Sequence, residues 1–222
     1  MTRICLHPDA RAFLARAEPW LEQAEIENAM TLQSARFASG NPVHLPEPPY
    51  WATVEDRGDV VGCAFRTPPY RLGLTALPLD AIPKLVQSVA GIYRTLSGVA
   101  GPEPAASAFT AEWTALRGGR ASVQSRQRLL AHKAIVPIEA PPPAGRLRRA
   151  TVADAALARS WGSAFAYESG LAAFDGDVCC RLIPLGLLHL WDDGAPRCML
   201  GVLRETRNAA AVGILYTPPE LR

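Results

Sequence analysis

The stretch that decides the fold class is Ala211-Val212-Gly213-Ile214-Leu215-Tyr216-Thr217-Pro218-Pro219-Glu220-Leu221-Arg222. Its first part is apolar and ends in an aromatic residue, which is typical of a strand in a sheet. The two prolines that follow end the strand, because proline lacks the N–H group that a sheet ladder needs. The stretch therefore predicts a strand over residues 208–216 that ends at a turn.

A proline-rich segment lies upstream of this strand. It reads Val136-Pro137-Ile138-Glu139-Ala140-Pro141-Pro142-Pro143-Ala144-Gly145. Three consecutive prolines cannot continue a helix and impose an extended path on the backbone. We therefore expect one domain over residues 1–135, a linker over 136–145 and a second domain over 146–222.

The first domain alternates between helix and strand patterns. Asp9 is placed to cap a helix that Pro19 kinks or splits, and residues 56–59 form a hairpin turn between two apolar runs. Further helices are predicted over residues 26–37, 79–96 and 105–117. Strands are predicted over residues 51–55, 60–65, 70–75 and 98–101, and near 127–135.

The second domain begins with the same order of elements. Strands are predicted over residues 146–150, 187–191, 198–203 and 208–216, and helices from Thr151 or Asp154 to Glu168 and over 177–183. Both halves thus run helix, helix, hairpin, strand. The pattern predicts an α/β (α+β) fold, with a mixed, mostly antiparallel sheet flanked by helices in each half.

Bulk composition excludes several classes of protein. A net charge of +2 is too small for a nucleic-acid-binding protein. No stretch reaches the ~20 apolar residues needed to cross a membrane, and the N-terminus lacks the apolar core of a signal peptide. The five cysteines and four histidines show no metal-ligand spacing, so we expect no metal. We expect a cytoplasmic protein with reduced cysteines.

The chain resembles the GNAT N-acetyltransferases, and in particular a bacterial type with two tandem domains. The residues that carry the likeness are 62–69, 98–102, Trp161, Phe165, Glu168, 190–192 and 216–220. The resemblance implies transfer of acetyl from acetyl-CoA, as co-substrate, to a primary amine of a small molecule or peptide. In that family the last strand leads into a glycine-rich turn that holds the pyrophosphate, and Arg222 would be the first residue of this turn.

The same resemblance assigns the cofactor-binding residues. Backbone groups of Ile214, Leu215 and Tyr216 would lie along the pantetheine arm, followed by Thr217 and Arg222. Residues 76–83 of the first domain contain no glycine pair that could replace the turn. We therefore expect a degenerate first domain, a second domain truncated at the start of the pyrophosphate turn, and impaired activity.

Trp161, Phe165 and Glu168 lie at helical spacing and share one helix face. Two aromatic side chains and a carboxylate would line an acceptor pocket, with Glu168 as the general base if burial raises its pKa. The alternative is that both aromatic residues belong to the core and that Glu168 lies at the polar end of the helix.

Two other functions remain open. The chain is either an enzyme of this kind, a catalytically inactive relic or protein-binding module, or a small-molecule binder. An apolar strand at an exposed sheet edge invites pairing with another chain. We therefore also expect a homodimer through the terminal strand.

Overall fold

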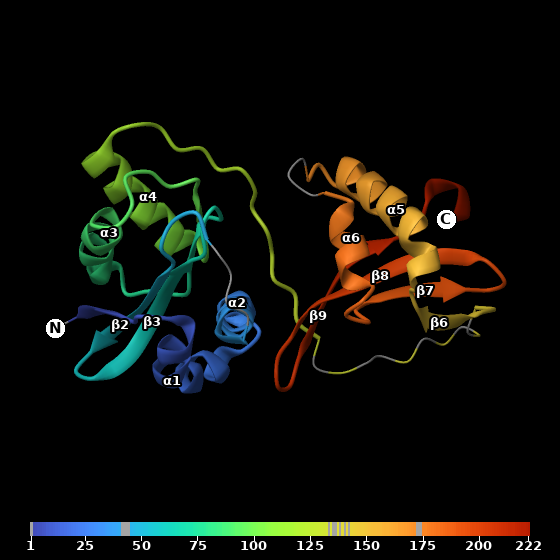
Figure 1. The fold of residues 1–222 in the computed structure, drawn as a ribbon, viewed down its shortest axis with the longest axis horizontal. Coiled ribbons are helices and arrows are strands. Elements are labelled where there is room, and N and C mark those ends of the chain that lie inside the picture. Colours follow the sequence, from blue (N-terminus) through green and yellow to red (C-terminus); the bar gives the residue numbers. More distant parts are fainter. Residues whose placement is uncertain are drawn as a thin grey trace. The chain divides into compact units, whose positions relative to one another are not determined.

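The computed structural model describes residues 2–40, 45–132, 134, 137, 139, 141, 143–171 and 175–222. The chain forms two compact units, residues 1–131 and 132–222 (Figure 1). Among the described residues, no helix is long and apolar enough to cross a membrane.

Unit 1 contains one five-stranded sheet in the order β1-β2-β3-β4-β5. All neighbouring strands are antiparallel except β4 and β5, which are parallel. The strands are β1 (Arg3–Leu6), β2 (Tyr50–Asp56), β3 (Asp59–Arg66), β4 (Leu72–Leu74) and β5 (Val99–Ala100), and the helices are α1 (Ala10–Leu21), α2 (Ala29–Gly40), α3 (Ile82–Ala90) and α4 (Glu103–Arg117).

Helices cover both faces of this sheet. Figure 1 shows α1 and α2 on one side of β2 and β3, and α3 and α4 on the other. Alternate residues of each strand therefore enter different cores, since side chains alternate across a strand. Trp51 and Phe65 pack with α1 and α2, whereas Tyr50, Ala52 and Ala64 pack with α3 and α4.

Local sequence explains several elements of unit 1. The Asp9 side chain accepts a hydrogen bond from the backbone N–H of Ala12 and caps α1 as predicted. Arg57 and Gly58 both have positive φ, of 52° and 96°, which is the conformation of a tight hairpin turn. Pro19 lies inside α1, which continues to Leu21.

Unit 2 contains a four-stranded antiparallel sheet in the order β6-β7-β8-β9. Its elements are β6 (Arg146–Arg149), α5 (Ala155–Glu168), α6 (Asp177–Leu182), β7 (Leu188–Asp192), β8 (Pro196–Glu205) and β9 (Ala210–Tyr216). Both helices lie on one side of the sheet (Figure 1). The core between helices and sheet includes Trp161, Cys179, Leu188 and Leu190.

The two units begin with the same order of elements, namely strand, helix, helix and three strands. The strand order is also the same over these elements, so β6 to β9 correspond to β1 to β4. The predicted fold class, an α/β (α+β) fold with mostly antiparallel sheets flanked by helices, is confirmed. In unit 1 the chain adds α3, β5 and α4 after this shared part.

One predicted helix was too long, and one predicted strand is absent from the described residues. The helix predicted over 79–96 ends at Ala90, and the hydroxyl of the buried Tyr93 donates to the carbonyl of Pro48. The strand predicted near 127–135 is absent from residues 127–132 and 134, and 133 and 135 lie outside the described residues. Leu130 is 84% exposed, so this segment has no sheet face to pack against.

Candidate functional site

Strand β9 contains a β-bulge directly before its end. Met199 pairs with Tyr216 and Gly201 pairs with Gly213, so Ile214 and Leu215 together stand opposite one residue of β8. Ile214 has a φ of 54°, which is a strained conformation for a β-branched residue. Its side chain is 4% exposed, and burial in the core therefore holds the backbone in this conformation.

The bulge leaves backbone hydrogen-bonding groups of β9 without a regular partner in β8. A bulge leaves its extra residue outside the regular ladder of hydrogen bonds. Strand β9 is also an edge strand, with β8 as its sheet neighbour. The backbone of Ile214 and Leu215 is thus irregular at an open sheet edge, where a ligand can reach it.

Beyond the bulge, β9 meets the C-terminal end of α5. The hydroxyl of Tyr216 donates a 2.7 Å hydrogen bond to Glu168 Oε1. Arg222 donates from Nη2 to Glu168 Oε2 and from Nε to the carbonyl of Thr217, the latter at 2.9 Å. The structure therefore brings the predicted residues Glu168, Tyr216, Thr217 and Arg222 into one cluster.

The two predicted aromatic residues also belong to this cluster. Trp161 and Phe165 both contact the ring of Tyr216 edge-on, with centroid distances of 6.4 Å each. Trp161 is 9% exposed, and Phe165 packs against the same core. These aromatic side chains are thus core residues that form the wall behind Tyr216.

The electrostatics of Glu168 differ from the expectation. Hydrogen bonds from Arg222 and then Tyr216 hold the pKa of Glu168 below its usual range. Donation to Glu168 in turn raises the pKa of the Tyr216 hydroxyl. The condition under which Glu168 would act as the general base, a pKa raised by burial, is therefore not met. Sequence spacing gives no sign of the two donors. A carboxylate whose pKa is lowered stays ionised, so it is better suited to binding a cation than to accepting a proton.

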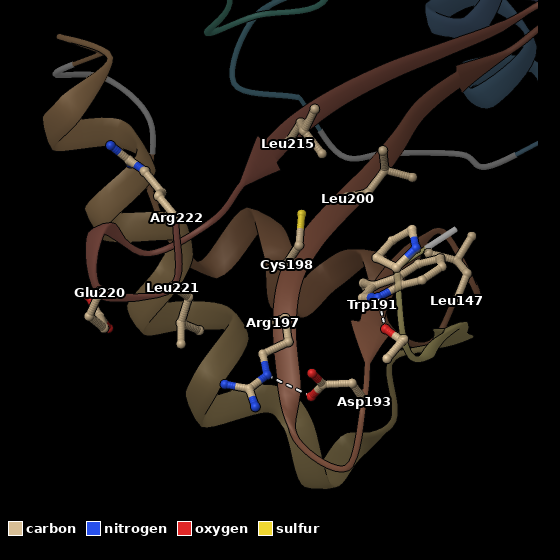
Figure 2. Close-up of a pocket in the computed structure, with 12 residues that line it drawn as sticks. Leu147, Trp191, Asp193, Arg197, Cys198, Leu200, Leu215, Glu220, Leu221 and Arg222 are labelled. Atoms are coloured by element: carbon tan, nitrogen blue, oxygen red, sulfur yellow. Dashed lines mark hydrogen bonds and ion pairs between the residues drawn. The ribbon is translucent and has the colours of Figure 1, made fainter. Parts of the chain in front are cut away.

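The opposite face of the sheet in unit 2 carries an open groove (Figure 2). Its volume is about 670 Å³. Its apolar lining comes from β6 to β9, from residues 143–144 before β6 and from the 3₁₀ turn Pro219–Leu221. The apolar residues that line it include Leu147, Trp191, Cys198, Leu200, Leu215 and Leu221. Leu147 and Leu215 are 55% and 62% exposed. This apolar face was not predicted from the sequence. The signal for it is that Leu200 and Leu215 are apolar and are adjacent in the strands to the buried Met199 and Tyr216, so they point to the opposite face of the sheet.

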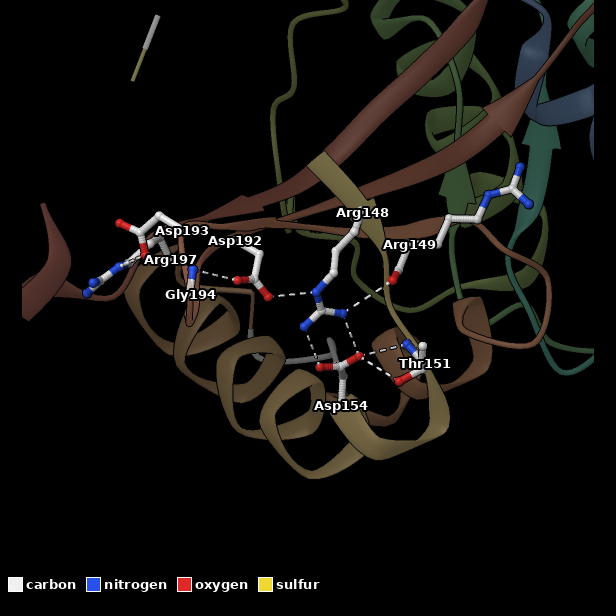
Figure 3. Close-up of polar contacts among 8 residues, drawn as sticks. All are labelled: Arg148, Arg149, Thr151, Asp154, Asp192, Asp193, Gly194 and Arg197. Atoms are coloured by element: carbon white, nitrogen blue, oxygen red, sulfur yellow. Dashed lines mark hydrogen bonds and ion pairs between the residues drawn. The ribbon is translucent and has the colours of Figure 1, made fainter. Parts of the chain in front are cut away.

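A second polar cluster fastens α5 to the sheet (Figure 3). Arg148 donates to both carboxylate oxygens of Asp154 at 2.9 Å and to Asp192 at 2.7 Å. Asp154 also accepts from Thr151 in a capping box. Hydrogen bonds, first from Arg148 and then from Thr151, hold the pKa of Asp154 well below its usual range. Arg148 therefore has a structural role.

Comparisons with known proteins add no assignment. No family model, curated protein or solved structure matches the chain. All five cysteines are free, and the residues that the structure describes contain no group of His, Cys, Asp and Glu suited to a metal ion. The β9 bulge and the cluster at Glu168 are therefore the features that indicate a function.

Proposed function

We propose that unit 2 holds the acetyl donor of a GNAT-type N-acetyltransferase, which transfers acetyl from acetyl-CoA to a primary amine. The observation that supports this most is the bulge at Ile214 and Leu215. The pantetheine arm of CoA is extended and carries amide groups, so it can pair with backbone N–H and C=O groups as an added strand does. An irregular edge at the end of β9 offers such groups.

The chemistry is a direct transfer. The neutral amine attacks the thioester carbonyl carbon, a C–N bond forms, the C–S bond breaks, and CoA leaves as a thiolate that takes up a proton. A backbone N–H at the bulge would stabilise the developing oxyanion. Leu215 lies at this position, and its side chain faces away from the core.

The contacts that this proposal predicts are those of the pantetheine arm with the backbone at the bulge. A hydrogen bond between neutral groups contributes only about 0.5–1.5 kcal/mol. We therefore expect weak binding of acetyl-CoA through the pantetheine arm.

This expectation is tested by NMR with fragments of the donor. Acetyl-CoA, S-acetyl-pantetheine and adenosine 3′,5′-bisphosphate are titrated separately into the ¹⁵N-labelled chain. Acetyl-CoA and S-acetyl-pantetheine should both shift the amide signals of Leu215 and Tyr216, and the bisphosphate should not. Equal shifts with the bisphosphate, or no shift in β9 at millimolar ligand, would count against the proposal.

A protein-binding module is the second candidate function. The open face of the sheet favours it, because Val212 and Leu215 are 58% and 62% exposed on an edge strand. In that case β9 pairs with another chain and acetyl-CoA leaves its amides unchanged. For either function we infer a cytoplasmic location, since the free cysteines suit a reducing compartment.

A further inference from the structure

We propose that Glu168, the carbonyl of Thr217 and the ring of Tyr216 form a binding site for an organic cation, and that the guanidinium group of Arg222 occupies this site in the present structure. The ligand class is a guanidinium or primary ammonium group on an alkyl chain. The assignment of this site to the acceptor rests on the proposed function. The cation site itself rests on the contacts below.

The contacts of Arg222 are those by which proteins recognise cations. A carboxylate oxygen of Glu168 and the backbone carbonyl of Thr217 both accept from the guanidinium, and carboxylates are the stronger of these acceptors. The Arg222 Cζ atom also lies 5.9 Å from the ring centroid of Tyr216, within the range of a cation–π interaction. Charge, hydrogen bonds and an aromatic face thus converge on one position.

The site is held in place by groups other than Arg222. The hydroxyl of Tyr216 orients the Glu168 carboxylate through its 2.7 Å hydrogen bond. Tyr216 is 5% exposed, and Trp161 and Phe165 fix its ring from the core side. The carboxylate therefore keeps its position when Arg222 leaves.

Arg222 can be displaced. Its side chain is 52% exposed, whereas that of Glu168 is 34% exposed. It follows a short 3₁₀ turn, Pro219–Leu221, rather than a long helix or strand. A tethered group competes with an effective concentration in the millimolar range. Arg222 therefore masks the site against weak ligands, and its removal should reveal the site.

The experiment uses methylguanidinium and n-butylammonium as probes, with neutral N-methylacetamide as the control ligand. The full chain is labelled with ¹³C at glutamate carboxylates and with ¹⁵N, so that Glu168 and Tyr216 report binding. Wild type, Arg222→Gln and the double variant Glu168→Gln with Arg222→Gln are compared. Arg197→Gln is the matched control, because Arg197 forms an ion pair with Asp193 instead.

The proposal expects Arg222→Gln to bind both cations at least about tenfold more tightly than wild type or Arg197→Gln, since the tethered competitor is gone. The double variant should lose this binding. If the double variant does not fold, the single variant is titrated at falling pH, where protonation of Glu168 should abolish binding. Absence of cation binding to Arg222→Gln, or binding that is independent of Glu168, overturns the proposal.

This outcome is separate from that of the acetyl-CoA experiment. The cation titration needs no acetyl donor and reports on Glu168, whereas the donor titration reports on Leu215. Cation binding without any donor shift in β9 would retain the site and reject its role in acetyl transfer.

Discussion

The hydroxyl of Tyr216 lies 2.7 Å from Glu168 Oε1 and joins the last residue of β9 to the last residue of α5. The same tyrosine directly follows the bulge at Ile214 and Leu215. Tyr216, predicted to lie along the acetyl donor, and Glu168, predicted as the general base, are therefore joined by one hydrogen bond. This connection underlies both the proposed transfer and the proposed cation site.

Replacement of the two donors should change the pKa of Glu168 in a fixed order. Arg222→Gln removes the larger cause of its lowered pKa and Tyr216→Phe removes the smaller one. Both variants should raise the pKa of Glu168 toward its usual range, and Arg222→Gln should raise it more. A ¹³C carboxylate titration by NMR measures this directly. An unchanged pKa in Arg222→Gln would mean that the ion pair does not form in solution.

Unit 1 should lose stability in acid through Glu55. Hydrogen bonds from Arg16, then Arg3 and Thr53, lower the pKa of Glu55 to about 2, from a usual value of 4.5. A lowered folded-state pKa adds stability above pH 4.5, and this stability is lost as the pH falls through about 2. We expect this contribution to the free energy of unfolding to be about 1–3 kcal/mol, because solvent screens the charges of the exposed arginines.

Urea unfolding of unit 1 at several pH values between 2 and 6 checks this prediction. Glu55→Gln should flatten the pH dependence over that range. The control is Glu18→Gln, because the carboxylate of Glu18 pairs with Arg36 and its side chain is 35% exposed. This variant should keep the pH dependence of the wild type. A wild-type curve that is as flat as that of Glu55→Gln would contradict the account.

Arg148→Met should destabilise unit 2. The substitution leaves the carboxylates of Asp154 and Asp192 without their shared partner, and the side chain of Asp154 is 11% exposed. We expect a loss of about 1–3 kcal/mol in the free energy of unfolding. The control is Arg149→Met, because Figure 3 shows the Arg149 side chain pointing away from this cluster. Equal effects of the two substitutions in urea titrations would argue against a structural role for Arg148.

In the absence of acetyl-CoA, the exposed edge of unit 2 should drive self-association. Strand β9 carries no charged residue over Ala210–Tyr216, and charged residues are a common protection of sheet edges. Sedimentation velocity should show a concentration-dependent dimer that Leu215→Lys weakens. Val152→Lys, at a residue that is 83% exposed outside the sheet, should leave the dimer intact. A wild-type monomer at every concentration would reject the predicted homodimer.

Local signals were sufficient for much of the fold. The hairpin between β2 and β3 was predicted because Arg57 and Gly58 lie in a turn whose chemistry is local. The same holds for Asp9, which caps α1 with its own side chain. The repeated order of elements followed from these signals and gave the correct fold class.

Features that depend on distant partners could not be predicted. The pKa of Glu168 is set by Arg222, which lies 54 residues away in the sequence. Arg148 pairs with Asp192 of another strand, and no local pattern in the sequence indicates this contact. The bulge at Ile214 has no sequence signal, because a β-branched residue at positive φ is disfavoured locally and is held there by the core.

The most direct test of the central claim is the affinity of acetyl-CoA for a chain without the bulge. Deletion of Leu215 leaves Ile214 alone opposite Leu200 and so restores one-to-one pairing between Met199 and Gly201. Deletion of Asn208 in the preceding turn is the matched control. Thermal melting establishes that each variant folds. The account predicts that wild type and the Asn208 deletion bind acetyl-CoA weakly in an NMR titration and that the Leu215 deletion does not. Equal affinity in all three chains would contradict a donor site at β9.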